Sequence, residues 1–214
     1  MTLLEVRDLG FAYAARSTPV LASVSASFAE GAITAVTGPS GAGKSTLLYL
    51  LGLLLRPSSG AVLVGGRAVS PLSDAERSVI RSRTVGFVFQ DALLDRSRSA
   101  LDNVLEPAVF AGVRRAAVEP RARELLERMG VAHRARHRPG QMSGGQAQRV
   151  ALCRALLLRP RIVLGDEPTG NLDRENAEVV WAVLAGEAAA GVTVVVATHD
   201  DVLVSRADQR VHLA

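Results

Sequence analysis

The sequence predicts an α/β domain with a helical insertion, and three observations carry this prediction. A short apolar run, residues 32–37, is followed at once by a glycine-rich loop and then by a leucine-rich helical pattern. Two later runs, residues 162–164 and 192–197, are apolar throughout, as is typical of central parallel strands covered on both faces. From about residue 91 to residue 138 the apolar spacing turns helical. Strands that alternate with helices indicate a parallel sheet.

The remaining strand predictions fall in the first 90 residues, where glycines mark the turns. Patterns rich in β-forming residues cover three ranges, 3–9, 20–28 and 61–64. A further short strand is predicted over residues 85–89. In the helical stretch, residues 119–129 place Leu125, Leu126 and Met129 on one side, so we expect that side to be buried.

The composition is that of a single soluble globular domain. The chain has 214 residues, of which 48% are hydrophobic and 21% are charged. Its one cysteine, Cys153, excludes an internal disulfide and lies in an apolar stretch, where a buried and inert thiol is expected. The longest leucine-rich run, residues 47–55, is far shorter than the roughly 20 residues that span a bilayer. Since no signal-peptide pattern opens the chain either, we expect it not to cross a membrane by itself.

Positive charge is unevenly distributed along the chain. Lys44 is the only lysine, and the other side chains behind the formal net charge of +4 are arginines. Arginines crowd between residues 114 and 138, where a solvated helical face is the first interpretation. A contact with anionic lipid head groups is the main alternative. Nucleic-acid binding is not expected, because no aromatic side chains that could stack on bases are interleaved with the arginines.

A phosphate-binding loop is predicted between the strand at 32–37 and the leucine-rich helix. Residues 38–45 read G-P-S-G-A-G-K-S and match the pattern G-x-x-x-x-G-K-[ST] in its required context. The glycines let backbone N–H groups converge on phosphate oxygens at the positive end of the helix. Lys44 is expected to reach the β- and γ-phosphates of a nucleotide, and Ser45 to ligate Mg²⁺. The expected nucleotide-binding residues of this loop are Gly38, Pro39, Ser40, Gly41, Ala42, Gly43, Lys44, Ser45 and Thr46.

Two carboxylates, Asp166 and Glu167, closely follow the apolar strand at 162–164. A buried parallel strand delivers such residues to the carboxyl edge of the sheet, where ligands bind. Asp166 suits an indirect hold on Mg²⁺. Glu167 suits the base that orients and polarises the attacking water in phosphoryl transfer.

A second helix start has features that suit an anion. Ser143 is the expected N-cap of an amphipathic helical pattern, and Gly144, Gly145 and Gln146 follow it. Each glycine weakens the helix by roughly 1 kcal/mol relative to alanine, a cost that makes sense where an anion must approach the backbone. The chain therefore either binds two nucleotides or shares each site with a second copy.

The loop at 38–45, the segment 143–146, the Asp166-Glu167 pair and His199 resemble the ABC transporter ATPases in order and spacing. The resemblance covers essentially the whole chain. It implies a P-loop NTPase with a RecA-like parallel-sheet core, an antiparallel β subdomain and a helical subdomain. It also favours the shared site, in which two cassettes pack head to tail and each ATP lies between the loop of one and residues 143–146 of the other.

The same resemblance implies roles that the residues alone do not. Tyr13 is expected to stack on adenine, although a core position is an equal alternative on the sequence alone. Gln90 is expected to sense Mg²⁺ and the attacking water and to couple to a membrane partner. Asp173 is expected at the dimer interface, and His199 at the γ-phosphate. The expected catalytic residues are Lys44, Gln90, Glu167 and His199, and the expected Mg²⁺ ligands are Ser45, Gln90 and Asp166.

We expect one domain over residues 1–214, with the catalytic core and β subdomain at about 1–90 and 155–214 and the helical subdomain at about 91–154. Residues 85–90, 100–104 and 167–173 resemble the branch of macrolide exporters, lipoprotein-release machines and a division-linked ATPase. This implies a peripheral ATPase on the cytoplasmic face of the membrane, which pairs with itself or a paralogous cassette and drives integral permease subunits as an exporter or a mechanotransmission system. The alternative is a regulatory ATPase that controls a cell-envelope or division enzyme without transport.

Overall fold

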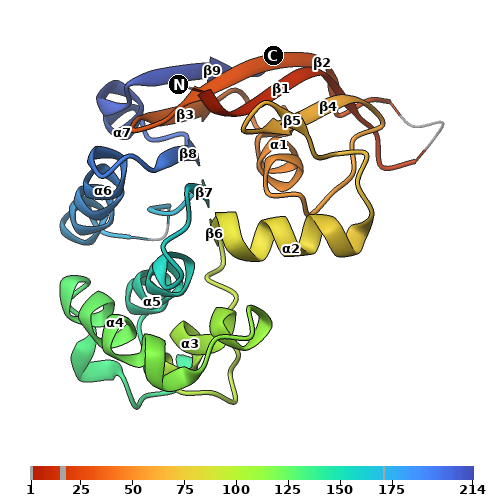
Figure 1. Ribbon diagram of the computed structural model, residues 1–214. Helices are drawn as coiled ribbons and strands as arrows, with labels where there is room; N and C mark the ends of the chain where they lie inside the picture. Colours follow the sequence, from red (N-terminus) through yellow and green to blue (C-terminus); the bar gives the residue numbers. More distant parts are fainter. Residues whose placement is uncertain (1, 15–17, 171) are drawn as a thin grey trace.

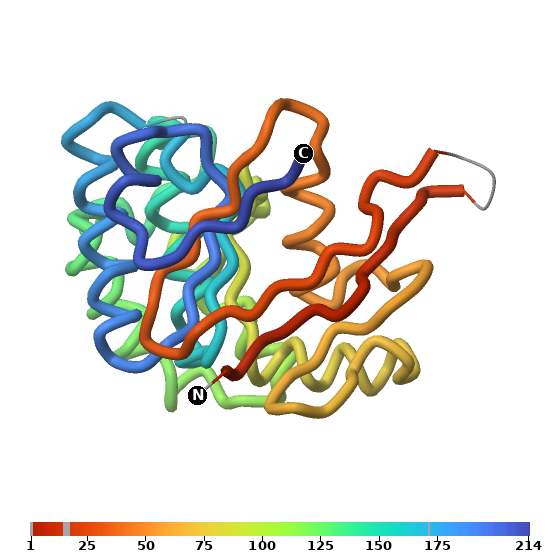
Figure 2. Tube along the Cα trace, turned by 90° about the horizontal axis from the view of Figure 1, so that it is seen from above, coloured from red at the N-terminus to blue at the C-terminus, as the bar shows by residue number. Residues whose placement is uncertain are grey.

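Two sheets organise the computed structural model, which describes residues 2–14, 18–170 and 172–214 (Figure 1). One is a parallel sheet in the order β6 (Val85–Val88), β7 (Ile162–Asp166), β8 (Thr193–Ala197), β3 (Ile33–Thr37) and β9 (Gln209–His212). The other is antiparallel, in the order β2 (Leu21–Ala29), β1 (Thr2–Phe11), β4 (Ser59–Val64) and β5 (Arg67–Ala68). Seen from above, β9 runs beside β3, while β1 and β2 extend to one side (Figure 2).

The parallel sheet separates two hydrophobic cores, because its central strands are apolar on both faces. In β7, Val163 faces one core while Ile162 and Leu164 face the other. The core on the first face is formed with helices, and the core on the second face with α1 (Lys44–Leu51) and the antiparallel sheet. The prediction of central parallel strands from uninterrupted apolar runs is thus confirmed.

Helix α1 carries the predicted phosphate loop at its start and is fixed by burial. Its leucines 47, 48, 50 and 51 are completely buried, and each such side chain stabilises the fold by roughly 1.5–3 kcal/mol. The loop is therefore attached to a rigid element.

Three helices gather at the end of the molecule opposite the antiparallel sheet: α3 (Ala100–Phe110), α4 (Arg115–Arg128) and α5 (Gly144–Leu156) (Figure 1). Two 3₁₀ turns, η1 (Ala132–Arg134) and η2 (Pro139–Gln141), lie between α4 and α5, and α6 (Arg174–Ala189) and α7 (Asp201–Arg206) complete the fold. Leu125, Leu126 and Met129 are completely buried together, as their spacing predicts. Cys153 is buried too, and burial raises the pKa of its thiol to about 12, which makes it inert.

Some features of the fold differ from the sequence prediction, which also gave no ranges for β5, α6 and α7. The helical pattern was expected to begin near residue 91, but α3 begins at Ala100, and residues 91–99 form a loop. Helix α2 (Asp74–Thr84) was not predicted, because its only buried side chain is Arg77 and no apolar stripe marks it. Strand β9 was not predicted either, since this four-residue edge strand is mostly exposed and lacks an apolar run. No helix of the described residues is long and apolar enough to span a bilayer.

Candidate functional site

The predicted phosphate loop connects the end of β3 to the start of α1. Gly43 is the N-cap of α1 with φ of 88°, and a Cβ there would lie 2.8 Å from a methyl group of Leu21. At Gly38, with φ of 147°, a Cβ would overlap the carbonyl oxygen of Leu213. Both positions therefore require glycine. The ammonium of Lys44 donates to the carbonyls of Gly38 (2.8 Å) and Pro39 (3.0 Å), so it lies within the curve of the loop.

Asp166, the last residue of β7, lies directly against the start of α1. Its carboxylate accepts hydrogen bonds from the Ser45 hydroxyl (3.0 Å) and the Tyr49 hydroxyl (3.4 Å). The side chain is buried, and this burial raises the pKa of the carboxyl. The structure thus brings together the two residues that were predicted from separate motifs to serve a cation.

Glu167 adopts a backbone conformation that is unusual for glutamate. Its φ is 46°, and its N–H donates to the carbonyl of Ala197 at the end of β8 (2.9 Å). Strain of this kind persists where the surrounding structure imposes it, often at functional sites. One carboxylate oxygen lies 2.8 Å from Nδ1 of His199, and the other is buried without a hydrogen-bond partner among the described residues.

The contact between Glu167 and His199 has a pH-dependent consequence. The hydrogen bond to the carboxylate raises the pKa of the imidazole above its ordinary value of 6.5. The pair therefore stabilises the fold most below that ordinary value, and the contribution is lost as the pH rises through the raised pKa. We expect Glu167→Gln to lower the pKa of His199 toward the ordinary value, as measured by NMR titration of the imidazole. An unchanged titration curve would contradict the contact.

A hollow of about 600 Å³ unites most of the predicted site residues. It is lined by Tyr13, Val20, Gly38, Ser40, Gly41, Gly43, Lys44, Ser45, Thr46, Gln90, Asp166, Glu167 and His199. Pro39 and Ala42 belong to the same loop without lining the hollow. Tyr13 is 68% exposed and lies with its hydroxyl 3.3 Å from that of Thr46, so the alternative of a core tyrosine is wrong. Val20 was missed, because an apolar residue at a strand start carries no sequence signal of binding.

The second predicted phosphate-binding segment lies elsewhere. Ser143 is the N-cap of α5. Its hydroxyl oxygen accepts a hydrogen bond from the backbone N–H of Gln146 (3.2 Å), and the side-chain oxygen of Gln146 accepts one from the backbone N–H of Ser143 (3.1 Å). Among the described residues, none of the segment 143–146 lines the hollow around the loop, and neither does Asp173, which caps α6. One chain therefore presents two separate helix ends suited to phosphate.

Two side chains of α5 that sequence reasoning missed hold the segment around Gln90. The buried Gln148 amide donates to the carbonyl of Phe89 (3.0 Å). The Arg154 guanidinium donates to the carbonyls of Leu93 (2.7 Å) and Ala92 (2.8 Å). The last two residues, Leu93 and Ala92, have positive φ, 46° and 55°. A polar residue at a buried helical position was the only signal in the sequence, and it does not identify the partner.

A family model described as "ABC transporter" matches residues 21–170, well over half of the chain. The chain belongs to the ABC transporter family of ATPases. It therefore binds nucleotide and hydrolyses ATP, and its fold is that of the family's cassette.

Relatives and solved structures agree with this assignment. The ATPase is 45% identical to the lipoprotein-releasing system ATP-binding protein LolD of Geobacter metallireducens, across 99% of this chain and 96% of the relative. It is 43% identical to LolD of Myxococcus xanthus, across 100% of this chain and 97% of that one. Among solved structures, the dimeric bacterial ABC transporter cassette MJ0796 superposes with a TM-score of 0.92 at 34% identity, covering 99% of this chain and 94% of that one. A post-hydrolysis dimer of the same cassette, bound to ADP and Pi, gives a TM-score of 0.91 at 33% identity, with the same coverage.

Proposed function

We propose that this ATPase binds ATP between its own loop and the segment Ser143–Gln146 of a second cassette, either another copy or a paralogue. The observation that carries the proposal is the separation of two phosphate-suited helix ends in one chain, only one of which lines the hollow. The dimeric form of the similar cassette MJ0796 supports it. Two such chains packed head to tail would complete two equivalent sites. Asp173, near the start of α6, belongs at the interface between them.

The roles of the hollow's residues follow from their chemistry. Lys44 and the backbone N–H groups of the loop neutralise the phosphates, and the exposed ring of Tyr13 offers a face for adenine. Glu167 orients and polarises the attacking water, and His199 places a donor beside the γ-phosphate. Since phosphoryl transfer needs little covalent help from the protein, these positions supply the catalysis.

Mg²⁺ suits the oxygen donors next to the loop. A hydroxyl and carboxylates are the ligand types that this hard cation prefers, and Ser45 already contacts Asp166. Asp166 is buried beside the negative charge of Glu167, whose second oxygen is buried and has no hydrogen-bond partner in the described part of the chain, so a cation there would relieve an unfavourable desolvation. Ser45, Asp166 and Gln90 would hold the ion. When bound, Mg²⁺ supplies charge that stabilises the phosphate oxygens.

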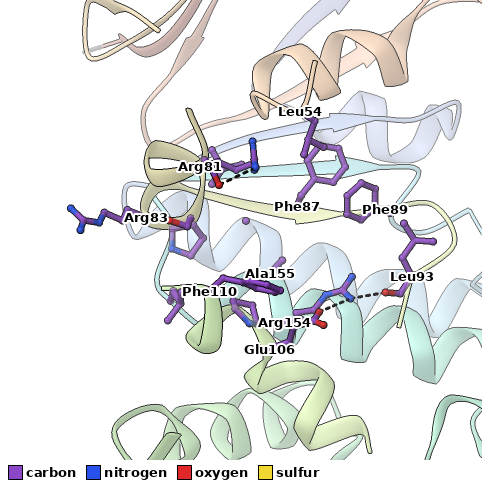
Figure 3. A pocket seen from close by; sticks show the side chains of 17 residues that line it. Leu54, Arg81, Arg83, Phe87, Phe89, Leu93, Glu106, Phe110, Arg154 and Ala155 are labelled. Carbon is purple, nitrogen blue, oxygen red and sulfur yellow. Dashed lines mark hydrogen bonds and ion pairs between the residues drawn. The ribbon is translucent and has the colours of Figure 1, made fainter. Parts of the chain in front are cut away.

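Membrane subunits are proposed to dock in a groove that is lined by Phe89 and Leu93, residues on either side of Gln90 in the chain (Figure 3). This groove of about 530 Å³ lies between α2, β6, α3 and α5. Phe87 and Phe89 stack within it with ring centroids 4.3 Å apart, and Leu93 is 58% exposed at its edge. An apolar groove of this size fits a short amphipathic segment of a partner. Residues 91–154, as a helical subdomain, would transmit the motion of this docked partner segment to the ATP site.

The similarity to LolD proteins favours lipoprotein release as the work that is driven, with the ATPase peripheral on the cytoplasmic face of the membrane. The test is affinity purification of the tagged chain with its membrane subunits, followed by reconstitution and measurement of ATP-dependent lipoprotein release. Leu93→Asp should abolish co-purification, whereas Val202→Asp on α7, where the native side chain is 56% exposed, should not. Recovery of an envelope or division enzyme with no permease would instead support the regulatory alternative and overturn a transport function.

A further inference from the structure

The excess positive charge of this protein is concentrated around α3, α4 and the two 3₁₀ turns. Residues 95–138 contain ten arginines and six acidic residues, an excess of four that equals the formal net charge of the whole chain. Half of these arginines form ion pairs with acidic side chains, namely Arg98, Arg115, Arg121, Arg123 and Arg128. The uncompensated positive charge therefore belongs to the other five arginines, namely Arg96, Arg114, Arg134, Arg136 and Arg138.

Two of the uncompensated arginines, Arg136 and Arg138, converge on one hollow of about 600 Å³, which Arg98 and Arg115 also line. Both are exposed, and no acidic side chain in the described parts of the chain lies within ion-pair distance of either. Asp102 lines the same hollow, but its carboxylate is occupied by Arg115 at 2.7 Å and by the Ser99 hydroxyl at 2.6 Å. The hollow is thus a place of unbalanced positive charge.

The same hollow has an apolar side. Leu105 and Ala108 of α3 line it and are buried. Val109 and Val113 line it while exposed by 73% and 37%. Phe110, 78% exposed, follows Val109 in the chain and lines the neighbouring groove between α2, β6, α3 and α5 (Figure 3). Exposed apolar side chains next to cations are what a surface needs to meet an amphiphile.

We propose that this arginine hollow binds the head group of an anionic phospholipid. The phosphate lies between the guanidinium groups of Arg136 and Arg138, whose planar forks match phosphate oxygens. The glycerol and first acyl carbons lie against Val109 and Val113. The site would hold the helical end of the protein against an anionic bilayer.

A phospholipid fits this face better than other anions do. Inorganic phosphate would use the arginines and leave the apolar side chains without a partner. Single-stranded nucleic acid would need several aromatic platforms, and Phe110 is the only aromatic side chain between residues 95 and 138 apart from histidine. The proposal stands on the charge and shape of this face alone, so its failure would leave the proposed function untouched.

The test is flotation of the full-length chain, without nucleotide, with vesicles of pure phosphatidylcholine or with 30% phosphatidylglycerol added. Binding is expected to the anionic vesicles only. The double variant Arg136→Gln/Arg138→Gln should bind about 25-fold more weakly, from roughly a fivefold loss for each cation near a negative surface. Arg67→Gln/Arg210→Gln is the matched control: it removes the same charge from β5 and β9, which lie at the end opposite α3 (Figure 1).

Three outcomes would overturn the proposal. The first is unchanged vesicle binding by the Arg136/Arg138 variant, and the second is an equal loss in the control, which would indicate net charge rather than a site. The third is full binding by Val109→Ser/Val113→Ser, since only an adventitious phosphate contact would survive without the apolar side chains. Unchanged ATPase activity and thermal unfolding in each variant would establish that the fold is intact.

Discussion

Replacing Glu167 by glutamine is expected to lower ATP turnover by about 10²- to 10⁴-fold, the range for loss of one acid–base group, while ATP binding is retained. Glutamine preserves the size of the side chain but removes the negative charge that we propose polarises the attacking water. The Glu167 side chain is only 12% exposed, and one of its oxygens is buried with no hydrogen-bond partner among the residues that the structure describes, so its charge acts in a desolvated position. With hydrolysis blocked, the dimer should persist with bound ATP, as measured by size-exclusion chromatography beside a steady-state phosphate-release assay.

Glu187→Gln is the matched control for this change. Glu187 lies in α6, outside the hollow, and its side chain has a similar exposure of 14%. Its carboxylate lies 3.4 Å from the guanidinium of Arg128. Its turnover should be within about twofold of the wild type, the size of effect usual for a surface pair. Near-normal turnover by Glu167→Gln, or an equal loss in the control, would refute the role assigned to Glu167.

Two individually inactive variants are expected to restore activity when mixed. Lys44→Ala removes the cation from the loop, and Gly145→Asp places a negative charge where the segment 143–146 would meet phosphate. Aspartate in a first helical turn favours the helix, so the second variant should fold. At random mixing half of the dimers are mixed, and each keeps one of two sites intact, so about a quarter of wild-type turnover should return.

The mixing experiment distinguishes a shared site from a site within one chain. If each chain enclosed its own ATP, both variants would be defective in their only site, and the mixture would stay inactive. Gly186→Asp is the control: a Cβ at this glycine of α6 would have open space around it, with no neighbouring atom within 4 Å, so the substitution should leave turnover unchanged.

The sequence predicts this fold best where burial or backbone geometry restricts residue choice. The apolar runs of β7 and β8 are explained only by a sheet covered on both faces, and Gly38 and Gly43 occupy positions that no larger residue tolerates. Helix α2 could not be predicted from an apolar pattern, because its one buried side chain is an arginine, Arg77, which donates to the carbonyl of Leu55 at 3.0 Å. Its one signal was the capping box that joins Ser73 and Glu76.

The site residues that could be predicted are those that act together with their neighbours in the sequence. The loop and the Asp166-Glu167 pair are contiguous in sequence, so their spacing predicts their function. Val20 lines the hollow with residues far along the chain, and Gln148 and Arg154 donate hydrogen bonds to carbonyls about 60 residues away. No sequence spacing predicts such contacts.

The three carbonyls held by α5 have a mechanical consequence. Gln148 and Arg154 belong to α5, the helix that Ser143 caps. Their hydrogen bonds hold the backbone on both sides of Gln90, at Phe89, Ala92 and Leu93, against this helix. A displacement of the start of α5 would therefore be expected to shift both Gln90, which lines the nucleotide hollow, and Phe89 and Leu93, which line the apolar groove. In the shared site that we propose, α5 would therefore connect the nucleotide of the neighbouring cassette to the partner segment in the groove.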